Sequence, residues 1–338
     1  MTEAKVFRRL ELEETVDILL EKKNTLILCH ARPDCDTIGS GVALKMLLMA
    51  AGMKAHCICM NEIPHRLEFL PTLQSSFLPE NIPQDMDFER VISVDTASPA
   101  QLGDLAQDYL DRVELMIDHH GKGSQYADGY IRPDAAATGE MIFDISREML
   151  RRGAVREITK DIDICLYSAI SSDTGCFRFS SVTPRTHCIA AELLMSGIDA
   201  GEINHLLYDS KPFVQLKAEQ LGFEHMKLFS EGKIAIIEFP YELKAENGIE
   251  DQYMETLVDV ARSVEGVCVA VVIRQPRDAG IFRCSMRSSC DVDVSRICGV
   301  FGGGGHVKAA GCTIEADSIE TASRLVIEEI KKSMAHFD

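Results

Sequence analysis

The chain has 338 residues, a formal net charge of -18 and 46% hydrophobic residues. This length is enough for two domains with separate cores. No apolar run approaches the roughly 18 residues that a membrane-spanning helix needs, and the first residues lack the apolar segment of a secretion signal. The negative charge argues against a long nucleic-acid track, because such a track needs a basic face. We therefore expect a cytoplasmic protein without membrane contact.

The 12 cysteines are scattered along the chain, and no CxxC pair occurs. Only Cys57 and Cys59 lie close together in sequence, so a zinc knuckle has no support. A long chain without a secretion signal favours buried, reduced thiols over a disulfide framework.

Short apolar runs alternate with helical patterns in the first half of the chain. The expected strands are 25–29, 56–60, 91–94 and 113–117, and the expected helices are 38–52, 138–151, 160–172 and a segment from Thr183 to about Gly197. Thr183 before a proline is a typical helix start. Such an alternation predicts an α/β domain with a doubly wound parallel sheet.

The second half has a different pattern. Residues 200–232 are polar and helical in character, and we expect them to connect two domains, 1–199 and 233–338. The second domain is predicted to be a smaller α/β domain. Its expected strands are 233–239, 267–275 and 281–289, with helices near 251–263 and 317–334 and a hairpin turn at 276–280.

Candidate metal ligands stand at the ends of the expected strands of the first domain. They are His30, Asp34, Asp36, Asp95, Asp118, His119 and His120, and Asp173 ends a helix pattern. The carboxyl ends of parallel strands meet at one edge of a sheet, so these side chains are expected to converge. Aspartates that lie this close repel one another unless cations bind between them.

Carboxylate and imidazole ligands suit Mn²⁺, and also Mg²⁺, Fe²⁺ or Co²⁺, better than Ca²⁺. About six such ligands suit two ions that share one carboxylate, and Asp95, alone at a strand end, is the natural bridge. Two ions can activate water and stabilise the charge of an in-line phosphoryl displacement. Each residue alone also has a structural explanation, such as turn formation by Asp-x-Asp. Their combination predicts a two-metal phosphoesterase.

The second domain contains a run of four glycines, 302–305, followed by His306. Glycine backbones can expose N–H groups to an anion, although such a run also suits a flexible turn. Arg283 and Arg287 alternate on the preceding strand and so share one face. They could clamp a phosphate or simply face solvent.

These residues resemble a known family. The segments CHARPDCDTIGS, VDTAS, IDHHG and SSDTGCFRFS resemble the four motifs of the DHH phosphoesterase superfamily, and GGGGHVKAAG resembles the signature of its associated C-terminal domain. The resemblance covers the chain from about 15 to 335. Its length is most similar to the stand-alone bacterial oligoribonucleases of the nano-RNase type. That group is also associated with removal of the 3'-phosphate from 3'-phosphoadenosine 5'-phosphate.

The resemblance implies a role for each matching residue. One metal ion would be held by His30, Asp34 and Asp95, and the other by Asp36, Asp95, His119 and Asp173. Asp118 would orient its neighbours, and His120 would contact the scissile phosphate or the leaving oxygen. The far end of the substrate would be held by Arg287, Gly303, Gly304, Gly305 and His306. The cofactor of the family is usually manganese.

Two positions depart from the usual first motif of the family. Arg32 stands where asparagine is usual, and Cys35 stands where glycine is usual. Arg32 could add a phosphate contact, and Cys35 could make the site sensitive to oxidation.

We expect hydrolysis of oligoribonucleotides of about two to five nucleotides to nucleoside 5'-monophosphates, with the substrate held between the two domains. Alternatives are a 3'-phosphoadenosine 5'-phosphate phosphatase and a phosphodiesterase for linear dinucleotides. A nucleotide-binding regulatory module without turnover is a further alternative, against which the intact ligand set argues. Pyrophosphate or polyphosphate hydrolysis ranks lowest, because the run RSSCDVDVS lacks a high density of Lys and Arg. A homodimer is compatible with the many apolar helices.

Overall fold

The computed structural model describes residues 6–73, 77–82, 87–277 and 280–334. The chain divides into two compact units, Met1–Ser210 and Lys211–Asp338, and each has its own sheet and hydrophobic core. Within the described part of the chain, no helix is both long enough and apolar enough to cross a membrane.

The first unit is built on a sheet of five parallel strands in the order β2-β1-β3-β4-β5. Their bounds are β1 (Thr25–Leu28), β2 (Ala55–Ile58), β3 (Arg90–Val94), β4 (Val113–Asp118) and β5 (Asp128–Ile131). The parallel sheet predicted from the alternation of strands and helices is confirmed. β5 is an additional strand that the sequence pattern does not indicate.

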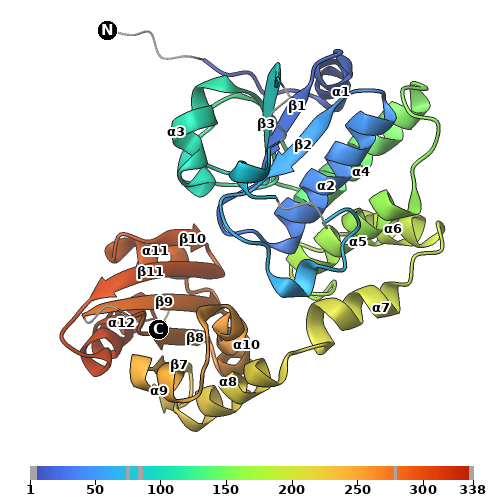
Figure 1. Ribbon diagram of the computed structural model, residues 1–338. Coiled ribbons are helices and arrows are strands. Elements are labelled where there is room, and N and C mark those ends of the chain that lie inside the picture. The colour runs from blue at the N-terminus through green and yellow to red at the C-terminus, as the bar shows by residue number, and fades with distance from the viewer. Residues whose placement is uncertain (1–5, 74–76, 83–86, 278–279, 335–338) are drawn as a thin grey trace, which may run out of the picture. The chain divides into compact units, whose positions relative to one another are not determined.

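Helices lie on both faces of this sheet, and further helices pack on them. The helices of the first unit are α1 (Leu12–Leu20), α2 (Cys35–Ala50), α3 (Leu105–Tyr109), α4 (Thr138–Arg151), α5 (Lys160–Asp173), α6 (Pro184–Leu194) and α7 (Ala200–Asn204). Figure 1 shows α2 and α4 on one face and α3 on the other. Side chains alternate along a strand, so Ile27 enters the core beneath α2 while Leu26 and Leu28 enter the core beneath α3.

The start of α2 is fixed by hydrogen bonding and close packing. The Asp34 carboxylate caps the helix by accepting from the backbone N–H groups of Asp36 and Thr37, each at 3.0 Å. Gly41 lets α2 approach the sheet, because a Cβ there would lie 2.8 Å from the Cys57 sulfur and 2.9 Å from the Cys29 sulfur. This close approach places the first turn of α2 beside the carboxyl end of β1.

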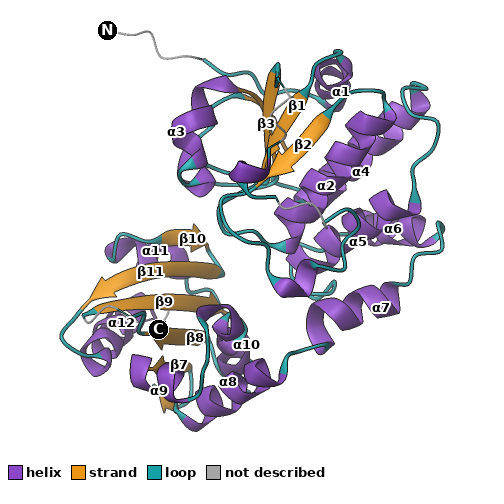
Figure 2. Ribbon diagram, in the orientation of Figure 1, coloured by secondary structure: helices purple, strands orange, loops and turns teal. Residues whose placement is uncertain are grey.

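The second unit has a mixed sheet of six strands in the order β10-β11-β9-β8-β7-β6, in which only β7 and β8 are parallel. The strands are β6 (Met226–Phe229), β7 (Ile234–Phe239), β8 (Val269–Arg274), β9 (Ile281–Ser288), β10 (Gly304–His306) and β11 (Ala309–Glu315). The helices are α8 (Phe213–Glu224), α9 (Tyr241–Glu246), α10 (Leu257–Arg262), α11 (Val294–Val300) and α12 (Ile319–Met334). Figure 2 shows these helices around the strands.

Two apolar cores hold the second unit together. One face of its sheet packs with α11 and α12, and the other packs with α8 and α10. The predicted hairpin of β8 and β9 is confirmed by their antiparallel pairing. Part of its predicted turn, residues 278–279, lies outside the described residues.

The segment 200–232 differs from the expected helical connector. Its first part, α7 and a π-helical turn at His205–Asp209, belongs to the first unit. Its second part, α8 and β6, belongs to the second unit. β6 is a strand because Met226–Phe229 pairs antiparallel with β7, a tertiary contact that overrides the helical character of the local sequence.

The expectation that all cysteines are reduced needs correction. Cys268 and Cys290 form a disulfide, with their Cα atoms 5.3 Å apart, a separation that disulfides require. Cys268 precedes β8 and Cys290 follows β9, so the hairpin brings the two residues together. The other ten are free thiols, of which eight are buried, Cys176 is half-buried and Cys188 is exposed.

Candidate metal centre

Acidic and imidazole side chains converge at the carboxyl ends of β1, β3 and β4. Three groups place their ligand atoms within 4.8 Å of one another: His30 with Asp34 and Asp95, Asp36 with His119 and Asp173, and Asp95 with His119 and His120. The structure thus brings together the six side chains that the family resemblance implies as metal ligands. Asp118 and His120, expected to act beside them, lie in the same cluster.

Asp95 stands at the centre of this cluster. Its side chain is 3% exposed, and its Oδ2 lies 3.5 Å from His30 Nε2. Its Oδ1 lies 3.7 Å from His119 Nε2. The two oxygens of one carboxylate therefore face two different groups of ligands, an arrangement that suits an aspartate shared by two ions.

The backbone conformation of Asp95 is unusual. Its φ is 55°, a left-handed conformation that costs a non-glycine residue roughly 1–2 kcal/mol. Its N–H donates to Ile117 O at 2.8 Å, which ties it to the adjacent β4. Strain held at one ligand of a cluster is typical of functional sites.

The first ligand group joins β1 to the start of α2. His30 lies two residues after the end of β1, and its Nε2 lies 3.4 Å from Asp34 Oδ2. The opposite oxygen, Asp34 Oδ1, is occupied by the backbone N–H groups of α2. Burial lowers the pKa of His30, but the negative charges of Asp34 and Asp95 outweigh it and raise that pKa to about 11.

The second ligand group joins α2, β4 and α5. His119 Nε2 lies 3.4 Å from Asp173 Oδ2 and 3.9 Å from Asp36 Oδ2. The other ring nitrogen, His119 Nδ1, lies 3.2 Å from Ala135 O. Donation from Nδ1 to that carbonyl leaves Nε2 as the nitrogen that faces the carboxylates.

The electrostatics of the cluster call for cations. Burial and the charges of Asp95 and Asp173 raise the pKa of Asp36 well above its usual range, and burial raises the pKa of Asp173 to about 7. Among the described residues, the ion-pair partners of Asp34, Asp36, Asp95 and Asp173 are histidines rather than lysine or arginine. Carboxylate oxygens and imidazole nitrogens with this local excess of negative charge fit divalent ions such as Mn²⁺.

Asp118 and His120 form a pair beside the ligands. His120 Nδ1 and Asp118 Oδ1 are 2.7 Å apart, and the Asp118 side chain is 3% exposed. Burial lowers the pKa of His120, but the Asp118 hydrogen bond and the charge of Asp95 raise it overall. Because Nδ1 is engaged by Asp118, this nitrogen is a poor metal ligand, although it lies 3.7 Å from Asp95 Oδ1.

The candidate substrate residues lie in the second unit. Arg283 and Arg287 share the face of β9 opposite Phe282, Cys284 and Met286, which enter the core. Arg283 Nη1 lies 3.7 Å from Asp251 Oδ2. Arg287 is half-buried, which lowers its pKa.

The glycine run has a packing role of its own. Gly304, Gly305 and His306 form the edge strand β10, which pairs with β11. A Cβ on Gly303 would lie 2.2 Å from Gly311 O, so the backbones meet too closely for any side chain there. Close strand packing therefore explains why glycine is needed at position 303. His306, which follows the glycine run, is exposed.

Several residues that hold the ligands were not predicted from the sequence. The Asp36 carboxylate accepts from Ser40 Oγ, from Thr138 N at 2.7 Å and from Gly139 N at 2.9 Å. The sequence pattern predicts a helix that starts at residue 138. It does not indicate that the start of this helix contacts Asp36, which lies more than a hundred positions away.

The two departures from the first motif lie in different surroundings. Arg32 is exposed. Cys35 is 1% exposed, and burial and the charges of Asp34 and Asp36 raise the pKa of its thiol. Burial limits the access of oxidants to this thiol, and the effect of Cys35 on the site stays a prediction.

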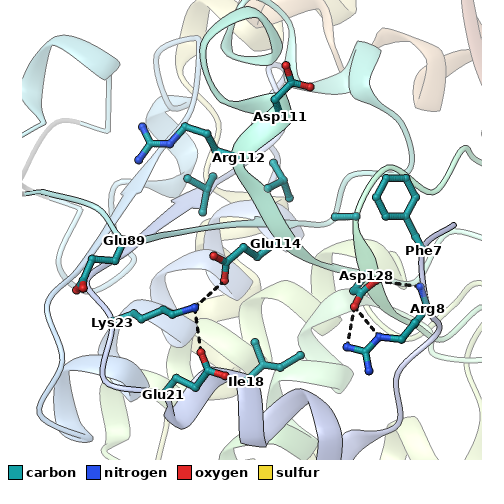
Figure 3. A pocket seen from close by; sticks show the side chains of 13 residues that line it. Phe7, Arg8, Ile18, Glu21, Lys23, Glu89, Asp111, Arg112, Glu114 and Asp128 are labelled. Atoms are coloured by element: carbon teal, nitrogen blue, oxygen red, sulfur yellow. Dashed lines mark hydrogen bonds and ion pairs between the residues drawn. The ribbon is translucent and has the colours of Figure 1, made fainter. Parts of the chain in front are cut away.

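A separate hollow of about 590 Å³ lies at the opposite edge of the same sheet. Figure 3 shows Lys23 between Glu21 and Glu114, and Arg8 against Asp128. The hollow contains none of the predicted site residues. This hollow is therefore distinct from the cluster of candidate ligands.

Comparison with known proteins agrees with the geometry. Residues 24–170 match the DHH family, N-terminal domain, and residues 232–332 match the DHHA1 domain. The chain is 30% identical to the bifunctional oligoribonuclease and PAP phosphatase NrnA of Thermus thermophilus, over 91% of this chain and 89% of that protein. It is 27% identical to the probable NrnA of Streptococcus mutans, over 88% and 92%.

A solved structure supports the fold. An exopolyphosphatase-related protein from Bacteroides fragilis superposes with a TM-score of 0.86 at 23% identity, covering 95% of this chain and 96% of that one. The converging ligands, the two matched domains and the similarity to NrnA together establish that this chain belongs to the DHH phosphoesterase family and is a metal-dependent hydrolase of phosphoester bonds.

Proposed function

We propose that this phosphoesterase degrades very short oligoribonucleotides, of about two to five nucleotides, to nucleoside 5'-monophosphates. The observation that carries this proposal is the similarity to the bifunctional oligoribonuclease and PAP phosphatase NrnA, which extends over 91% of the chain. Similarity of this extent includes both units. The intact cluster around Asp95 argues for turnover rather than for a regulatory module that only binds nucleotides.

The proposed cofactor is a pair of Mn²⁺ ions. His30, Asp34 and Asp95 are the ligands proposed for one ion, and Asp36, Asp95, His119 and Asp173 are proposed for the other. Two such ions supply an activated water nucleophile and offset the charge of the phosphate. The support is the donor set itself, since oxygen and imidazole nitrogen ligands suit manganese better than calcium.

His120 is the proposed general acid. The hydrogen bond between its Nδ1 and Asp118 fixes the orientation of the ring, and its raised pKa favours the protonated form. A protonated imidazole can donate a proton to the leaving oxygen as the phosphoester bond breaks. Asp118 is proposed to orient the ring and to stabilise its charge.

Arg283, Arg287 and His306, with the backbone of Gly303, Gly304 and Gly305, are proposed to bind the part of the substrate that is not hydrolysed. An arginine binds phosphate through two parallel N–H donors. The half-buried position of Arg287 favours this role for it over Arg283, because a charge is costly to bury without an anionic partner.

A second candidate activity is removal of the 3'-phosphate from 3'-phosphoadenosine 5'-phosphate. Both relatives above carry this activity in their names, and the same ligands could serve both reactions. We also propose that the protein acts in the cytoplasm, because RNA fragments and free nucleotides arise in that compartment.

A substrate panel tests both activities. The purified protein with added Mn²⁺ would be incubated with a dinucleotide, a five-mer, a twenty-mer, 3'-phosphoadenosine 5'-phosphate and pyrophosphate, beside an Asp95→Asn variant. Rapid mononucleotide release from the two shortest RNAs, absent in the variant, is the expected result. Turnover of 3'-phosphoadenosine 5'-phosphate alone would show that the protein is a phosphatase and not an oligoribonuclease. Rapid degradation of the twenty-mer would contradict specificity for short chains.

A further inference from the structure

The loop that joins β5 to α4 and the first turn of α4 contact three of the candidate metal ligands. Ala135 O lies 3.2 Å from His119 Nδ1, and the N–H groups of Thr138 and Gly139 donate to the two oxygens of Asp36. The Thr138 hydroxyl donates to Asp95 Oδ1 at 3.0 Å. Thr138 is therefore in direct contact with both Asp36 and Asp95.

The start of α4 explains why Thr138 can make both contacts. The first N–H groups of a helix have no partner within the helix, and Ala137 at the N-cap has no side chain that could accept from them. The Asp36 carboxylate acts as the cap of α4 and accepts from the Thr138 backbone N–H. The Thr138 hydroxyl is then free to donate to Asp95, and Thr138 is fully buried.

Close packing keeps the loop in place. Ala136 and Ala137 are 1% and 0% exposed. A Cβ on Gly139 would lie 2.8 Å from the Ala169 Cβ of α5, the helix that carries Asp173. Thr138 therefore cannot shift far without disturbing α5.

The Thr138 hydrogen bond selects one orientation of the Asp95 carboxylate. Oδ1 receives the hydroxyl and lies on the side of His119, while Oδ2 lies on the side of His30. Without the hydroxyl, the carboxylate can rotate about its Cβ–Cγ bond until its two oxygens no longer face one ligand group each. An aspartate that has turned in this way no longer links the two ligand groups.

We propose that Thr138 is a positioning residue that holds Asp95 in the orientation in which it bridges two metal ions. The proposal rests on the two-ion site proposed above. It makes the hydroxyl at position 138 a determinant of the affinity for the second ion, through its hydrogen bond to Asp95. Residues that orient metal ligands in this way typically change metal affinity by about 10–100-fold when they are replaced.

The test compares Thr138→Val, which keeps the shape and the backbone N–H groups, with Thr138→Ser, which restores the hydroxyl. Mn²⁺ binding would be measured by calorimetry, and magnetic coupling between the ions by electron paramagnetic resonance. We expect Thr138→Val to lower the affinity for the second Mn²⁺ ion by about 10–100-fold. The signal of magnetic coupling should be lost, and kcat should fall with little change in KM. Thr138→Ser should recover all of these properties.

Ser146→Ala is the matched control, because Ser146 is a buried hydroxyl on the same helix that donates to Phe143 O. It should bind Mn²⁺ as the wild type does. If Thr138→Val does not fold, Thr138→Ala removes the same hydroxyl with a smaller side chain. Two coupled ions in a folded Thr138→Val or Thr138→Ala protein would overturn the role of Thr138 alone. Fewer than two ions in the wild type would instead overturn the two-ion site.

Discussion

The two edges of the parallel sheet carry charge in opposite ways. At the amino edge, Lys23 in the hollow of Figure 3 forms ion pairs with Glu21 and Glu114, and Arg8 forms one with Asp128. At the carboxyl edge, Asp36 and Asp95 are almost fully buried, and among the described residues their ion-pair partners are histidines. The difference teaches that buried carboxylates without lysine or arginine partners mark the functional edge.

The largest effect is expected from Asp95→Asn. This substitution keeps the shape of the side chain but removes the charge that faces both ligand groups. If the transition state loses several kcal/mol of stabilisation by the metal ions, kcat/KM falls by about 10³-fold or more. The matched change at the other edge, Glu114→Gln, should leave kcat/KM unchanged, and equal losses in the two variants would break the contrast between the edges.

His120→Asn separates catalysis from metal binding at the carboxyl edge. Because Nδ1 is held by Asp118, we expect Mn²⁺ affinity to change little. The rate should fall by about 10²-fold or more through loss of the general acid. Single-turnover kinetics and Mn²⁺ calorimetry on the same sample check both parts, and a large loss of Mn²⁺ affinity would make His120 a ligand.

Metal binding at the carboxyl edge should depend strongly on pH. In the metal-free protein the pKa of His30 is raised to about 11 and that of His119 to about 9, so both rings hold a proton at about pH 7.5. A ring that binds metal must be neutral and a carboxyl ligand must be ionised, so Mn²⁺ should release about two protons from the histidines, and a further proton from any ligand carboxyl that holds one, and bind more tightly as the pH rises towards 9. Calorimetry in buffers of different ionisation enthalpy measures this release.

The same shifts give the metal-free fold the opposite pH dependence. A histidine whose folded pKa exceeds its unfolded value stabilises the fold fully below the unfolded pKa. This contribution is lost progressively as the pH rises from about 6.5 to the folded pKa, which is about 9 for His119 and about 11 for His30. Metal-free stability should therefore decline over that window. Mn²⁺ binding that releases no protons, with metal-free stability flat across the window, would show that the histidines are neutral before the metal arrives.

The smallest effect is expected from Lys23→Met at the amino edge. Lys23 lies within 3.2 Å of Glu21 and Glu114, but all three side chains are partly exposed. Exposed pairs of this kind contribute less than about 1 kcal/mol to the free energy of unfolding. Urea denaturation should show a change below that value, with Mn²⁺ affinity unaltered, and a lower affinity would mean that the two edges are coupled.

The sequence predicted the cluster well for a physical reason. β1, β3 and β4 are apolar runs that end abruptly at His30, Asp95 and the pair Asp118–His119, so the polar residue marks the strand end. Strand ends of a parallel sheet share one edge. Local pattern and a general rule of topology were therefore sufficient to bring these side chains together.

Other features depend on contacts that no local pattern records. β5 has only four residues, one of them Gly129, and β6 lies within a stretch of helical character. The partners Cys268 and Cys290 are 22 residues apart and meet only because β8 and β9 pair. The Thr138 hydroxyl meets Asp95 across 43 positions, so its role becomes visible only in the folded chain.

The most direct test of the shared aspartate is an anomalous-difference map from crystals grown with Mn²⁺. We predict two manganese peaks, one beside Asp95 Oδ2 on the His30 side and one beside Asp95 Oδ1 on the His119 side. A single peak, or two peaks that Asp95 does not join, would contradict the two-ion centre.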